Sequence, residues 1–276
     1  MAMAIGYGSG VMYQTGYDYG ASMPLLDMIF VVDDAEGWHR QNYDANRGHY
    51  RGMAAVIGPD LVSKLTRGFF PVAFFPHVDI VSGIQGKYGV VESQSFVEDL
   101  TDWRWMTLAG RLQKPIKKVS FSKNQTDKVE DAMKLNLQQA LSLARVMESR
   151  SKSLDGSELD DIDLVLKRIV GLSYMGDLRT KVGAESENKQ DKILDGNKEK
   201  LIQLYKPLII QAKEHPQYLR LPEFIDISDS KEIISKKIST INSRSSVKMA
   251  LNQFMLDSPS RNFKYIWAKL RKGIFK

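Results

Sequence analysis

The chain has 276 residues, of which 43% are hydrophobic and 26% charged, a composition that is ordinary for a globular protein and excludes a wholly disordered one. It contains no cysteine, which excludes a disulfide framework and a cysteine-based zinc site. The net charge of +6 is unevenly placed, because residues 231–276 carry a net +9 and the other residues a net −3. Such a basic end suggests a polyanionic partner, either a membrane surface or a nucleic acid.

Four strands are predicted in the first part of the chain. Residues 2–10 indicate a short strand that runs into a glycine-rich turn. Residues 25–32 indicate a buried strand, although Asp27 interrupts its apolar run. Residues 69–81 and 86–93 are two further strand candidates between turn residues.

Helices are predicted between these strands and predominate after them. One is expected to begin at Pro59, and another at Ser95, where Glu98 completes a capping box. Apolar side chains at helical spacing predict three longer helices, over residues 126–148, over residues 157–172 and within 197–215. Polar connections are expected over residues 150–158 and 183–192.

These elements predict an α+β protein with three regions. Residues 1–120 are expected to form a mixed sheet domain, and residues 121–230 a helical domain that closes over a cleft. Residues 231–276 are expected to form a basic region that ends in an amphipathic helix. No run of about 18 apolar residues occurs, so no membrane-spanning helix is predicted.

The first strand leads into the sequence YGSG, which is typical of a phosphate-binding turn. Backbone N–H groups of Gly8, Ser9 and Gly10 can approach a triphosphate closely, and the serine hydroxyl can donate as well. Asp27 on the next strand can hold a divalent metal on the same phosphates. A Gly-Ser turn followed by an acidic strand resembles the polymerase-beta-like nucleotidyltransferase fold. The alternative interpretation of the turn is a flexible loop.

The acidic strand departs from that fold in one respect. The fold usually has two acids one residue apart, whereas the positions two residues either side of Asp27 are apolar. Asp33 and Asp34 lie about 20 Å further along an extended chain. Asp27 is therefore expected to be the only metal ligand from this strand, and Asp79 or another element is expected to supply a second.

Seven segments in a fixed order resemble the mitochondrial-type CDP-diacylglycerol synthase family, also called the translocator assembly and maintenance family. The resemblance covers roughly residues 5–210, and residues 231–276 share with the family only a helical and basic character. The segments are YGSGVMYQ, LLDMIFVVDDAEGWH, GKYGVVES, VEDLTDW, LAGRLQKPIK, GLSYMGDLR and NKQDKIL.

The resemblance implies a nucleotidyltransferase-like fold and a phosphatidate cytidylyltransferase activity. Such an enzyme joins CTP and phosphatidic acid to give CDP-diacylglycerol and pyrophosphate, using Mg²⁺ or another divalent cation. The product serves phosphatidylglycerol and cardiolipin synthesis. The family also implies a peripheral membrane protein, on the matrix face of the mitochondrial inner membrane or on the cytoplasmic face in a bacterium. The sequence lacks a transit-peptide pattern, which favours a bacterial or a trimmed protein.

The resemblance also implies roles for the residues of the first strands. Asp27 would hold the metal, and Gly8, Ser9 and Gly10 would hold the β- and γ-phosphates of CTP. Lys87, in GKYGVV, would meet a triphosphate oxygen as a compact point charge. The alternative for Lys87 is a solvated side chain at a turn.

Five later residues are candidates for substrate binding. Arg111 and Lys114 are three residues apart and can bind the phosphatidate head group or pyrophosphate, or can instead complement a helix dipole. Asp177 and Arg179 either face the substrate or form an ion pair that shapes the cleft. Lys189 matches the family's NK pair. A structural hydrogen-bonding role is expected for His39 in EGWH, because no metal-binding histidine spacing occurs.

The last residues predict a helix that lies in a membrane interface, with aromatic side chains towards the lipid and cations at the head groups. The alternative is a terminal helix packed on the core of the protein. The membrane-binding side chains would be Phe263, Lys264, Ile266, Trp267, Leu270, Arg271 and Lys272.

Two rival functions stay open from the sequence. One is a nucleotidyltransferase that acts on a soluble phosphate or an RNA end, although no RNA-binding module is recognisable and no nucleic-acid partner is expected. The other is a non-catalytic membrane-associated assembly factor, which the absent second acid beside Asp27 favours. The oligomeric state is left open.

Overall fold

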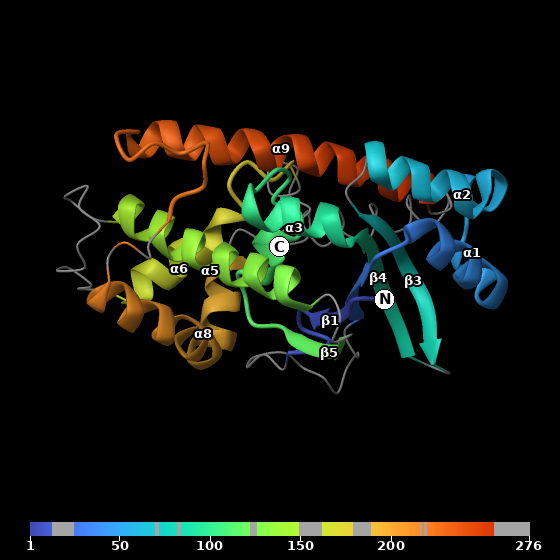
Figure 1. Cartoon of the computed structure of the whole chain (residues 1–276), viewed down its shortest axis with the longest axis horizontal. Helices are drawn as coiled ribbons and strands as arrows, with labels where there is room; N and C mark the ends of the chain where they lie inside the picture. Colours follow the sequence, from blue (N-terminus) through green and yellow to red (C-terminus); the bar gives the residue numbers. More distant parts are fainter. Residues whose placement is uncertain are drawn as a thin grey trace, which may run out of the picture.

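A computed structural model describes residues 1–12, 25–69, 72–81, 84–121, 126–148, 162–178, 189–215, 217 and 220–256. It has a sheet region and a helical region side by side, and the long helix α9 runs along both (Figure 1). The elements are β1 Met3–Tyr7, β2 Leu26–Val32, α1 Ala35–Ala45, η1 Arg47–His49, α2 Met53–Gly68, β3 Ala73–Val81, β4 Ile84–Glu92, α3 Ser93–Thr101, α4 Ala109–Leu112, β5 Lys117–Phe121, α5 Thr126–Glu148, α6 Ile162–Leu172, α8 Lys189–Glu214 and α9 Lys231–Leu256.

The sheet has five strands in the order β3-β4-β2-β1-β5. The strands β2 and β4 are parallel, and the other neighbours are antiparallel. This register places Tyr7 of β1 and Lys87 of β4 on either side of Asp27 in β2. The α+β class and the four predicted strands are confirmed, and β5 is an additional strand that the sequence analysis did not predict.

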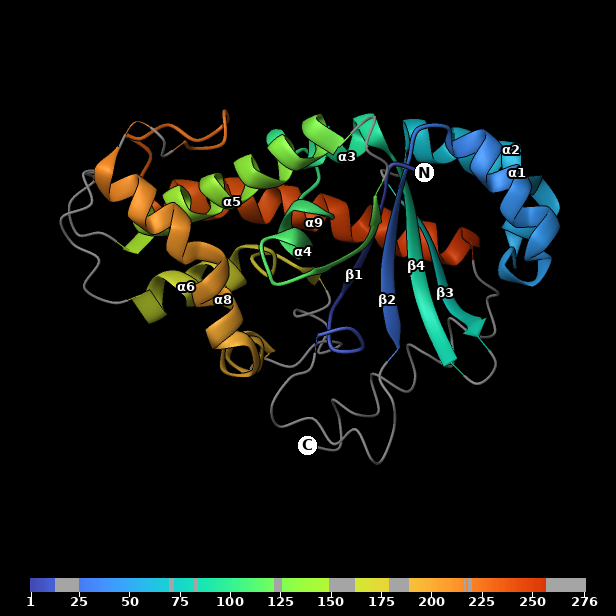
Figure 2. The same cartoon turned by 60° about the horizontal axis from the view of Figure 1, so that its bottom comes forward.

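Side chains of β2 alternate between two apolar cores, as expected for a strand covered on both faces. Ile29 and Val31 pack into the core beneath α3 and α5, whereas Met28 and Phe30 pack towards α1 and α2. A third core lies among the helices, and its largest fully buried side chains include Trp103, Tyr205, Leu141, Leu143 and Leu166. Figure 2 shows α1 and α2 together beyond the β3 edge of the sheet, with the helical region on the other side.

The helix α9 joins the two regions through buried amide side chains. Asn252 accepts a hydrogen bond from the Phe74 backbone N–H at 3.3 Å and donates to the Val72 carbonyl at 3.0 Å. Asn242 donates to the carbonyls of Leu172 and Met175, both at 2.8 Å. Because these contacts reach β3 and the end of α6, α9 sets the position of the sheet relative to the helices.

Several predicted boundaries are corrected by the structure. The helix α3 begins at Ser93 rather than Ser95, so Ser95 lies inside the helix and does not cap it. Glu98 forms an ion pair with Arg104 at 2.6 Å. The helix α8 begins at Lys189, so the end of the predicted polar connection is helical. The start predicted at Pro59 corresponds to a kink inside α2, where Gly58 has a φ of 75°.

No helix in the described part of the chain is both long enough and apolar enough to cross a membrane.

His39 is fully buried in α1 and makes the structural hydrogen bonds expected of it. Its Nδ1 lies 2.8 Å from the Tyr50 hydroxyl, which donates to the His39 carbonyl oxygen at 3.1 Å. The buried Nε2 atom has no hydrogen-bond partner among the described residues. Burial lowers the pKa of His39 from 6.5 to about 4.

Acidification is expected to destabilise the fold through His39. The unfolded chain binds a proton near pH 6.5 and the folded chain only near pH 4, so the unfolding free energy falls as the pH falls through this window. The expected loss at pH 4.5 is about 2–3 kcal/mol. Urea titrations of wild type and His39→Gln between pH 7 and pH 4.5 measure it, and the variant is expected to lack this part of the acid sensitivity. Parallel profiles for the two proteins would contradict the assignment.

Candidate active site

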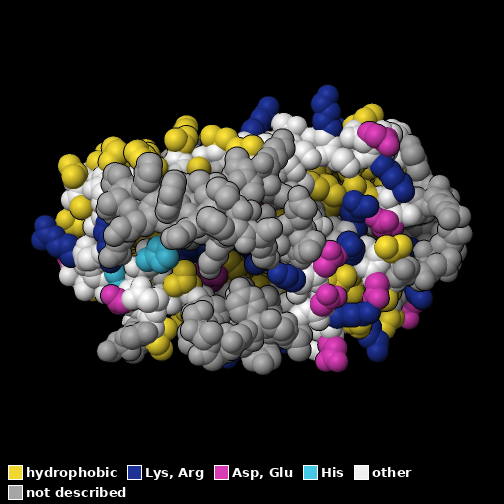
Figure 3. All heavy atoms as spheres, turned by 180° about the vertical axis from the view of Figure 1, so that it is seen from behind, with side chains coloured by type: hydrophobic (Ala, Val, Ile, Leu, Met, Phe, Trp, Pro, Cys, Tyr) yellow, Lys and Arg dark blue, Asp and Glu magenta, His cyan; other side chains and the backbone are white. Residues whose placement is uncertain are grey.

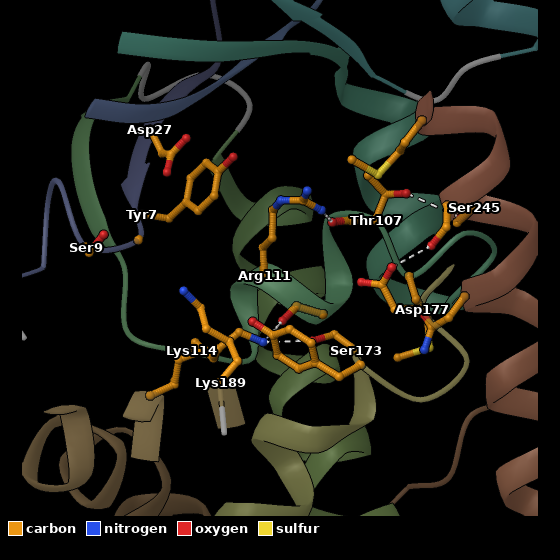
Figure 4. Close-up of a pocket in the computed structure, with 18 of the residues that line it drawn as sticks. Tyr7, Ser9, Asp27, Thr107, Arg111, Lys114, Ser173, Asp177, Lys189 and Ser245 are labelled. Atoms are coloured by element: carbon orange, nitrogen blue, oxygen red, sulfur yellow. Dashed lines mark hydrogen bonds between the residues drawn. The ribbon is translucent and has the colours of Figure 1, made fainter. Parts of the chain in front are cut away.

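A polar cavity of about 240 Å³ lies where the sheet meets the helical region. Figure 4 shows its side chains converging from both regions. Four groups of residues line it: the end of β1 with the starts of β2 and β4, α4 with the residues before and after it, the turn after α6, and the inner faces of α8 and α9. They include Tyr7, Gly8, Ser9, Asp27, Lys87, Thr107, Arg111, Lys114, Ser173, Tyr174, Asp177, Lys189, Asn197, Asn242, Ser245 and Ser246.

The glycine-rich turn folds back over the start of β2. The Gly8 carbonyl accepts the backbone N–H of Met12 at 2.8 Å, and Gly8 has a φ of 73°, which favours glycine. A Cβ on Gly8 would lie 3.0 Å from Asp27 Oδ2, and a Cβ on Gly10 would lie 2.1 Å from the Leu25 carbonyl oxygen. Glycine at these positions therefore lets the turn lie directly beside the Asp27 carboxylate.

Asp27 and Lys87 form an ion pair at this end of the cavity. Their strands are parallel neighbours, and Lys87 Nζ lies 3.0 Å from Asp27 Oδ1. Burial by itself would lower the pKa of Lys87, but charge interactions with the acidic side chains of Tyr7 and Asp27 outweigh burial and raise the pKa above its ordinary value. The lysine is therefore a positive charge at neutral pH.

Two further cations come from α4 and the residues after it. The Arg111 guanidinium lies over the rings of Phe74 and Tyr7, at 5.2 and 5.8 Å from their centroids, and donates to the Thr107 carbonyl. Lys114 Nζ donates to the Ser173 hydroxyl at 3.0 Å. These contacts hold both cations along the cavity, as Figure 4 shows.

A buried carboxylate organises the segment that carries these cations. Asp99 in α3 is fully buried, and its oxygens accept the backbone N–H groups of Trp105 at 2.8 Å, Leu108 at 2.6 Å and Ala109 at 3.3 Å. The chain it holds includes two non-glycine residues of positive φ, Trp103 at 51° and Met106 at 52°. Burial raises the pKa of Asp99, although these hydrogen bonds oppose the shift. Asp99 thus holds in place the chain segment that leads into α4.

Comparison with known proteins identifies the family of this chain. Residues 1–223 match the family model described as mitochondrial phosphatidate cytidylyltransferase. The chain belongs to this family. It is 31% identical to the mitochondrial phosphatidate cytidylyltransferase of Saccharomyces cerevisiae over 271 residues, which are 98% of this chain and 66% of the relative. The protein of the same name from Mus musculus is 31% identical over 95% of this chain and 73% of the relative.

The corresponding protein from Rattus norvegicus is 32% identical over 78% of this chain and 57% of the relative. The chain therefore spans 57–66% of the length of the rat and yeast relatives.

The cavity brings together most of the site residues predicted from the sequence of this phosphatidate cytidylyltransferase family member. They are Gly8, Ser9, Asp27, Lys87, Arg111, Lys114, Asp177 and Lys189. Gly10 packs beneath the turn and, like Asp79, is not one of the described residues that line the cavity. Asp79 lies on the edge strand β3, where its carboxylate accepts a hydrogen bond from the Gln85 side chain. Arg179 and the predicted membrane-binding residues from Phe263 to Lys272 lie outside the described residues.

The sequence analysis missed the polar side chains that α9 contributes and, in the turn after α6, the Ser173 side chain. Asn242, Ser245 and Ser246 occur in an unremarkable polar stretch of a long helix, and Ser173 was noted only as part of a motif. Three polar residues within five positions on one helix face were the only signal. That signal does not distinguish a cavity wall from a solvated face without the fold.

The family implies a divalent cation, and the donor set at Asp27 fits one. No cluster of three or more histidine or acidic side chains occurs among the described residues. Asp27 Oδ1 is buried, and apart from the ion pair with Lys87 it accepts no aligned hydrogen bond from the described residues. Because Mg²⁺ is commonly held by one or two carboxylates together with substrate phosphates and water, one carboxylate suffices for a cation that binds with a nucleotide.

Proposed function

We propose that this protein is a phosphatidate cytidylyltransferase that makes CDP-diacylglycerol and pyrophosphate from CTP and phosphatidic acid. The observation that carries the proposal is the convergence of Lys87, Arg111, Lys114 and Lys189 with the Gly8–Ser9 turn around Asp27 in one cavity. The reaction brings several negative charges together, so fixed cations are the groups that it needs most. The family assignment supports the same activity.

The proposed reaction is a displacement at phosphorus. An oxygen of the phosphatidate phosphate forms a bond to the α-phosphorus of CTP, and the bond to the bridging oxygen of pyrophosphate breaks. Because the attacking oxygen is already an anion, no strong general base is required. What the protein must supply is alignment and neutralisation of charge.

The residues beside Asp27 are proposed to hold the triphosphate. Asp27 would bind Mg²⁺, which when bound neutralises phosphate charge and polarises the phosphoryl group. The turn of Gly8, Ser9 and Gly10 would offer backbone N–H groups to the β- and γ-phosphates, and Lys87 would contact a phosphate oxygen once CTP competes for its ion pair with Asp27.

The cations on the other side of the cavity are proposed to receive the second phosphate. Arg111 presents a planar guanidinium that suits a phosphate dianion, and Lys114 and Lys189 add point charges beside it. In this arrangement Arg111 serves both the attacking phosphate and the departing pyrophosphate. Asp79 is proposed only as an outer partner of the metal, because it lies on the edge strand and not at the cavity.

The architecture fits the proposal of a nucleotidyltransferase-like sheet domain, residues 1–120, whose cleft is closed by a helical domain, residues 121–230. The parallel pair β2 and β4 presents Asp27 and Lys87 towards the helices. Residues 231–276 are proposed as the basic C-terminal region, although α9 itself packs against both domains.

Peripheral association with an anionic membrane is part of the proposal. The predicted membrane helix lies outside the described residues. Within them, Figure 3 shows apolar side chains and cations along the edge formed by α2 and α9. The exposed apolar residues there include Val56, Leu61, Val247, Leu251 and Phe254. Exposed apolar side chains beside basic ones suit the surface of a bilayer that contains phosphatidate. The relatives are named as mitochondrial proteins. The proposed location is the matrix face of the inner membrane for a mitochondrial protein and the cytoplasmic face for a bacterial one.

The decisive experiment is a direct assay. Purified protein is incubated with α-phosphate-labelled CTP, vesicles containing phosphatidate, and Mg²⁺, and label in the lipid fraction is followed. Time-dependent formation of CDP-diacylglycerol with equal release of pyrophosphate is expected. A matched control uses vesicles of phosphatidylglycerol, which carry charge but no terminal phosphate. Label transferred to a soluble phosphate or to RNA, or no transfer at all, would contradict the proposal.

A further inference from the structure

Two buried polar atoms at the sheet end of the cavity have no hydrogen-bond partner among the described residues. One is Asp27 Oδ1, which has only its ion pair with Lys87, and the other is the Tyr7 hydroxyl oxygen. Tyr7 also lines the cavity. A buried polar group without a partner costs stability, so such a group in a folded protein needs an explanation. A metal ion would account for the Asp27 oxygen, whereas the Tyr7 hydroxyl needs a different partner.

The sheet aligns Tyr7 with the two charged residues at this end. Tyr7 is the antiparallel partner of Asp27, and Lys87 is the parallel partner of Asp27 on its other side. Residues that are opposite one another on neighbouring strands place their side chains on the same face of the sheet. This face meets the helices, because Tyr7 packs against the core beneath α3 and α5. The three side chains therefore form a row across β1, β2 and β4 that faces the helical region.

Arg111 lies over the same tyrosine. Its guanidinium carbon is 5.8 Å from the centroid of the Tyr7 ring, and Figure 4 shows Tyr7 between Asp27 and Arg111. The side chains of Lys87 and Arg111 are long and cationic, so a phosphate that enters the cavity is expected to draw both towards itself and to expose the Tyr7 hydroxyl. The hydroxyl then has an anion within reach and one proton to donate.

The position of Tyr7 favours one of the phosphates. Tyr7 directly precedes the turn of Gly8 and Ser9, where the β- and γ-phosphates are proposed to bind. Arg111, the proposed contact of the phosphatidate phosphate, lies over its ring. The α-phosphorus must lie between these two groups, because it is bonded to the pyrophosphate group before the reaction and to the phosphatidate oxygen after it. The α-phosphate is therefore the phosphate that we expect nearest to the Tyr7 hydroxyl.

We propose that Tyr7 is a catalytic residue whose hydroxyl donates a hydrogen bond to a non-bridging oxygen of the α-phosphate of CTP. The inference rests on the proposed function and extends it to a residue that touches the reacting group. The charge on these oxygens changes as the phosphatidate oxygen approaches and pyrophosphate departs, so an oriented donor stabilises the transition state. The hydroxyl keeps its proton throughout, and the only bonds that form and break are those of the displacement at phosphorus.

Tyr7→Phe tests the assignment because it removes only the hydroxyl. The kcat for CDP-diacylglycerol formation is expected to fall about 10- to 100-fold, the range of a hydrogen bond to a charged group. The urea midpoint is expected to stay the same or to rise, because the free protein loses a buried hydroxyl that has no described partner. A purely structural role would lower the midpoint instead. Tyr43→Phe, on α1 and not at the cavity, is the matched control and should change neither quantity.

Sulfur substitution at the α-phosphate identifies the contacted atom. Each of the two diastereomers of cytidine 5′-(α-thio)triphosphate replaces one non-bridging oxygen with sulfur, a weaker hydrogen-bond acceptor. Tyr7→Phe is expected to slow transfer from CTP and from one diastereomer by the same factor. It is expected to slow transfer from the other diastereomer by less than about threefold, because there the hydrogen bond is already weakened. Each rate is divided by the wild-type rate with the same nucleotide, which removes any direct effect of sulfur on the metal.

Three results would overturn the inference: an unchanged kcat in Tyr7→Phe, equal slowing with CTP and both diastereomers, or a urea midpoint that falls together with the activity. The proposed function is tested separately, by whether wild type transfers label from CTP to phosphatidate. Normal transfer by wild type together with an unaffected Tyr7→Phe protein overturns only the role of Tyr7. No transfer by wild type overturns the proposed function and the role of Tyr7 with it.

Discussion

Asp27→Asn is expected to lower kcat for CDP-diacylglycerol formation by about 1,000-fold or more, with the fold intact. The substitution keeps the size of the side chain but removes the carboxylate charge beside the glycine-rich turn. It also removes the partner of Lys87, whose ammonium lies 3.0 Å away. The charge balance that would draw a metal–nucleotide complex to this end of the cavity is lost with it. Steady-state turnover of labelled CTP on phosphatidate vesicles measures the effect.

Asp33→Asn is the matched control for Asp27. Asp33 follows the same strand but is exposed, where it accepts a hydrogen bond from Ser93 at 2.8 Å. Its replacement is expected to change kcat by less than about twofold, since surface substitutions rarely disturb a distant site. Far-ultraviolet circular dichroism and the thermal midpoint check that both variants fold. Undiminished CDP-diacylglycerol formation by a folded Asp27→Asn protein would remove Asp27 from the mechanism.

Asp99→Asn is expected to lower the unfolding free energy by about 2–4 kcal/mol. The two carboxylate oxygens receive the N–H groups of Trp105, Leu108 and Ala109 inside the protein. An asparagine side chain has only one oxygen that can accept these hydrogen bonds. Its amide NH₂ group would therefore face at least one buried backbone N–H donor, which would lose its hydrogen bond. The chain segment that leads into α4 is expected to shift, and Arg111, which follows this segment directly, is expected to shift with it. The KM for CTP is therefore expected to rise. Urea unfolding gives the first quantity and initial rates the second.

Glu98→Gln is the comparison for Asp99, one residue earlier in the same helix. Glu98 pairs with Arg104 on the surface at 2.6 Å, and exposed pairs of this kind contribute about 0–1 kcal/mol. Its replacement is therefore expected to leave both the unfolding midpoint and KM nearly unchanged. If Asp99→Asn behaved like Glu98→Gln, the buried carboxylate would not be what holds the segment in place.

The sheet end of the site was largely predictable from sequence, for local reasons. Glycines at positions 8 and 10 predict a tight turn. Asp27 is an acidic residue within an apolar strand, and such a residue indicates a functional site. Each signal can be read from its own short stretch of sequence, and Asp27 follows Gly10 by 17 residues. The place of Lys87 in the site was harder to predict. Its ion pair with Asp27 depends on β2 and β4 being parallel neighbours, which no local sequence pattern specifies.

The helical end of the site was not predictable in the same way. The buried face of α9 includes Asn242, Ser245 and Asn252, so the helix lacks the apolar stripe from which a packed helix is recognised. These polar residues are tolerated inside because they bond to backbone groups of β3, the α6 turn and the α4 approach. Their partners are 67 or more residues away in the sequence, which is beyond the range of local sequence patterns.

The sequence by itself determined the α+β class, the order of its main strands and helices, the turn beside Asp27 and the family to which the chain belongs. These follow from short-range spacing and from motifs that keep their order. The tertiary structure decided which charged side chains meet in one cavity, and that buried Asp99 holds the chain that leads into α4. Such facts depend on strand register and on hydrogen bonds between distant segments, and these form only when the chain is folded.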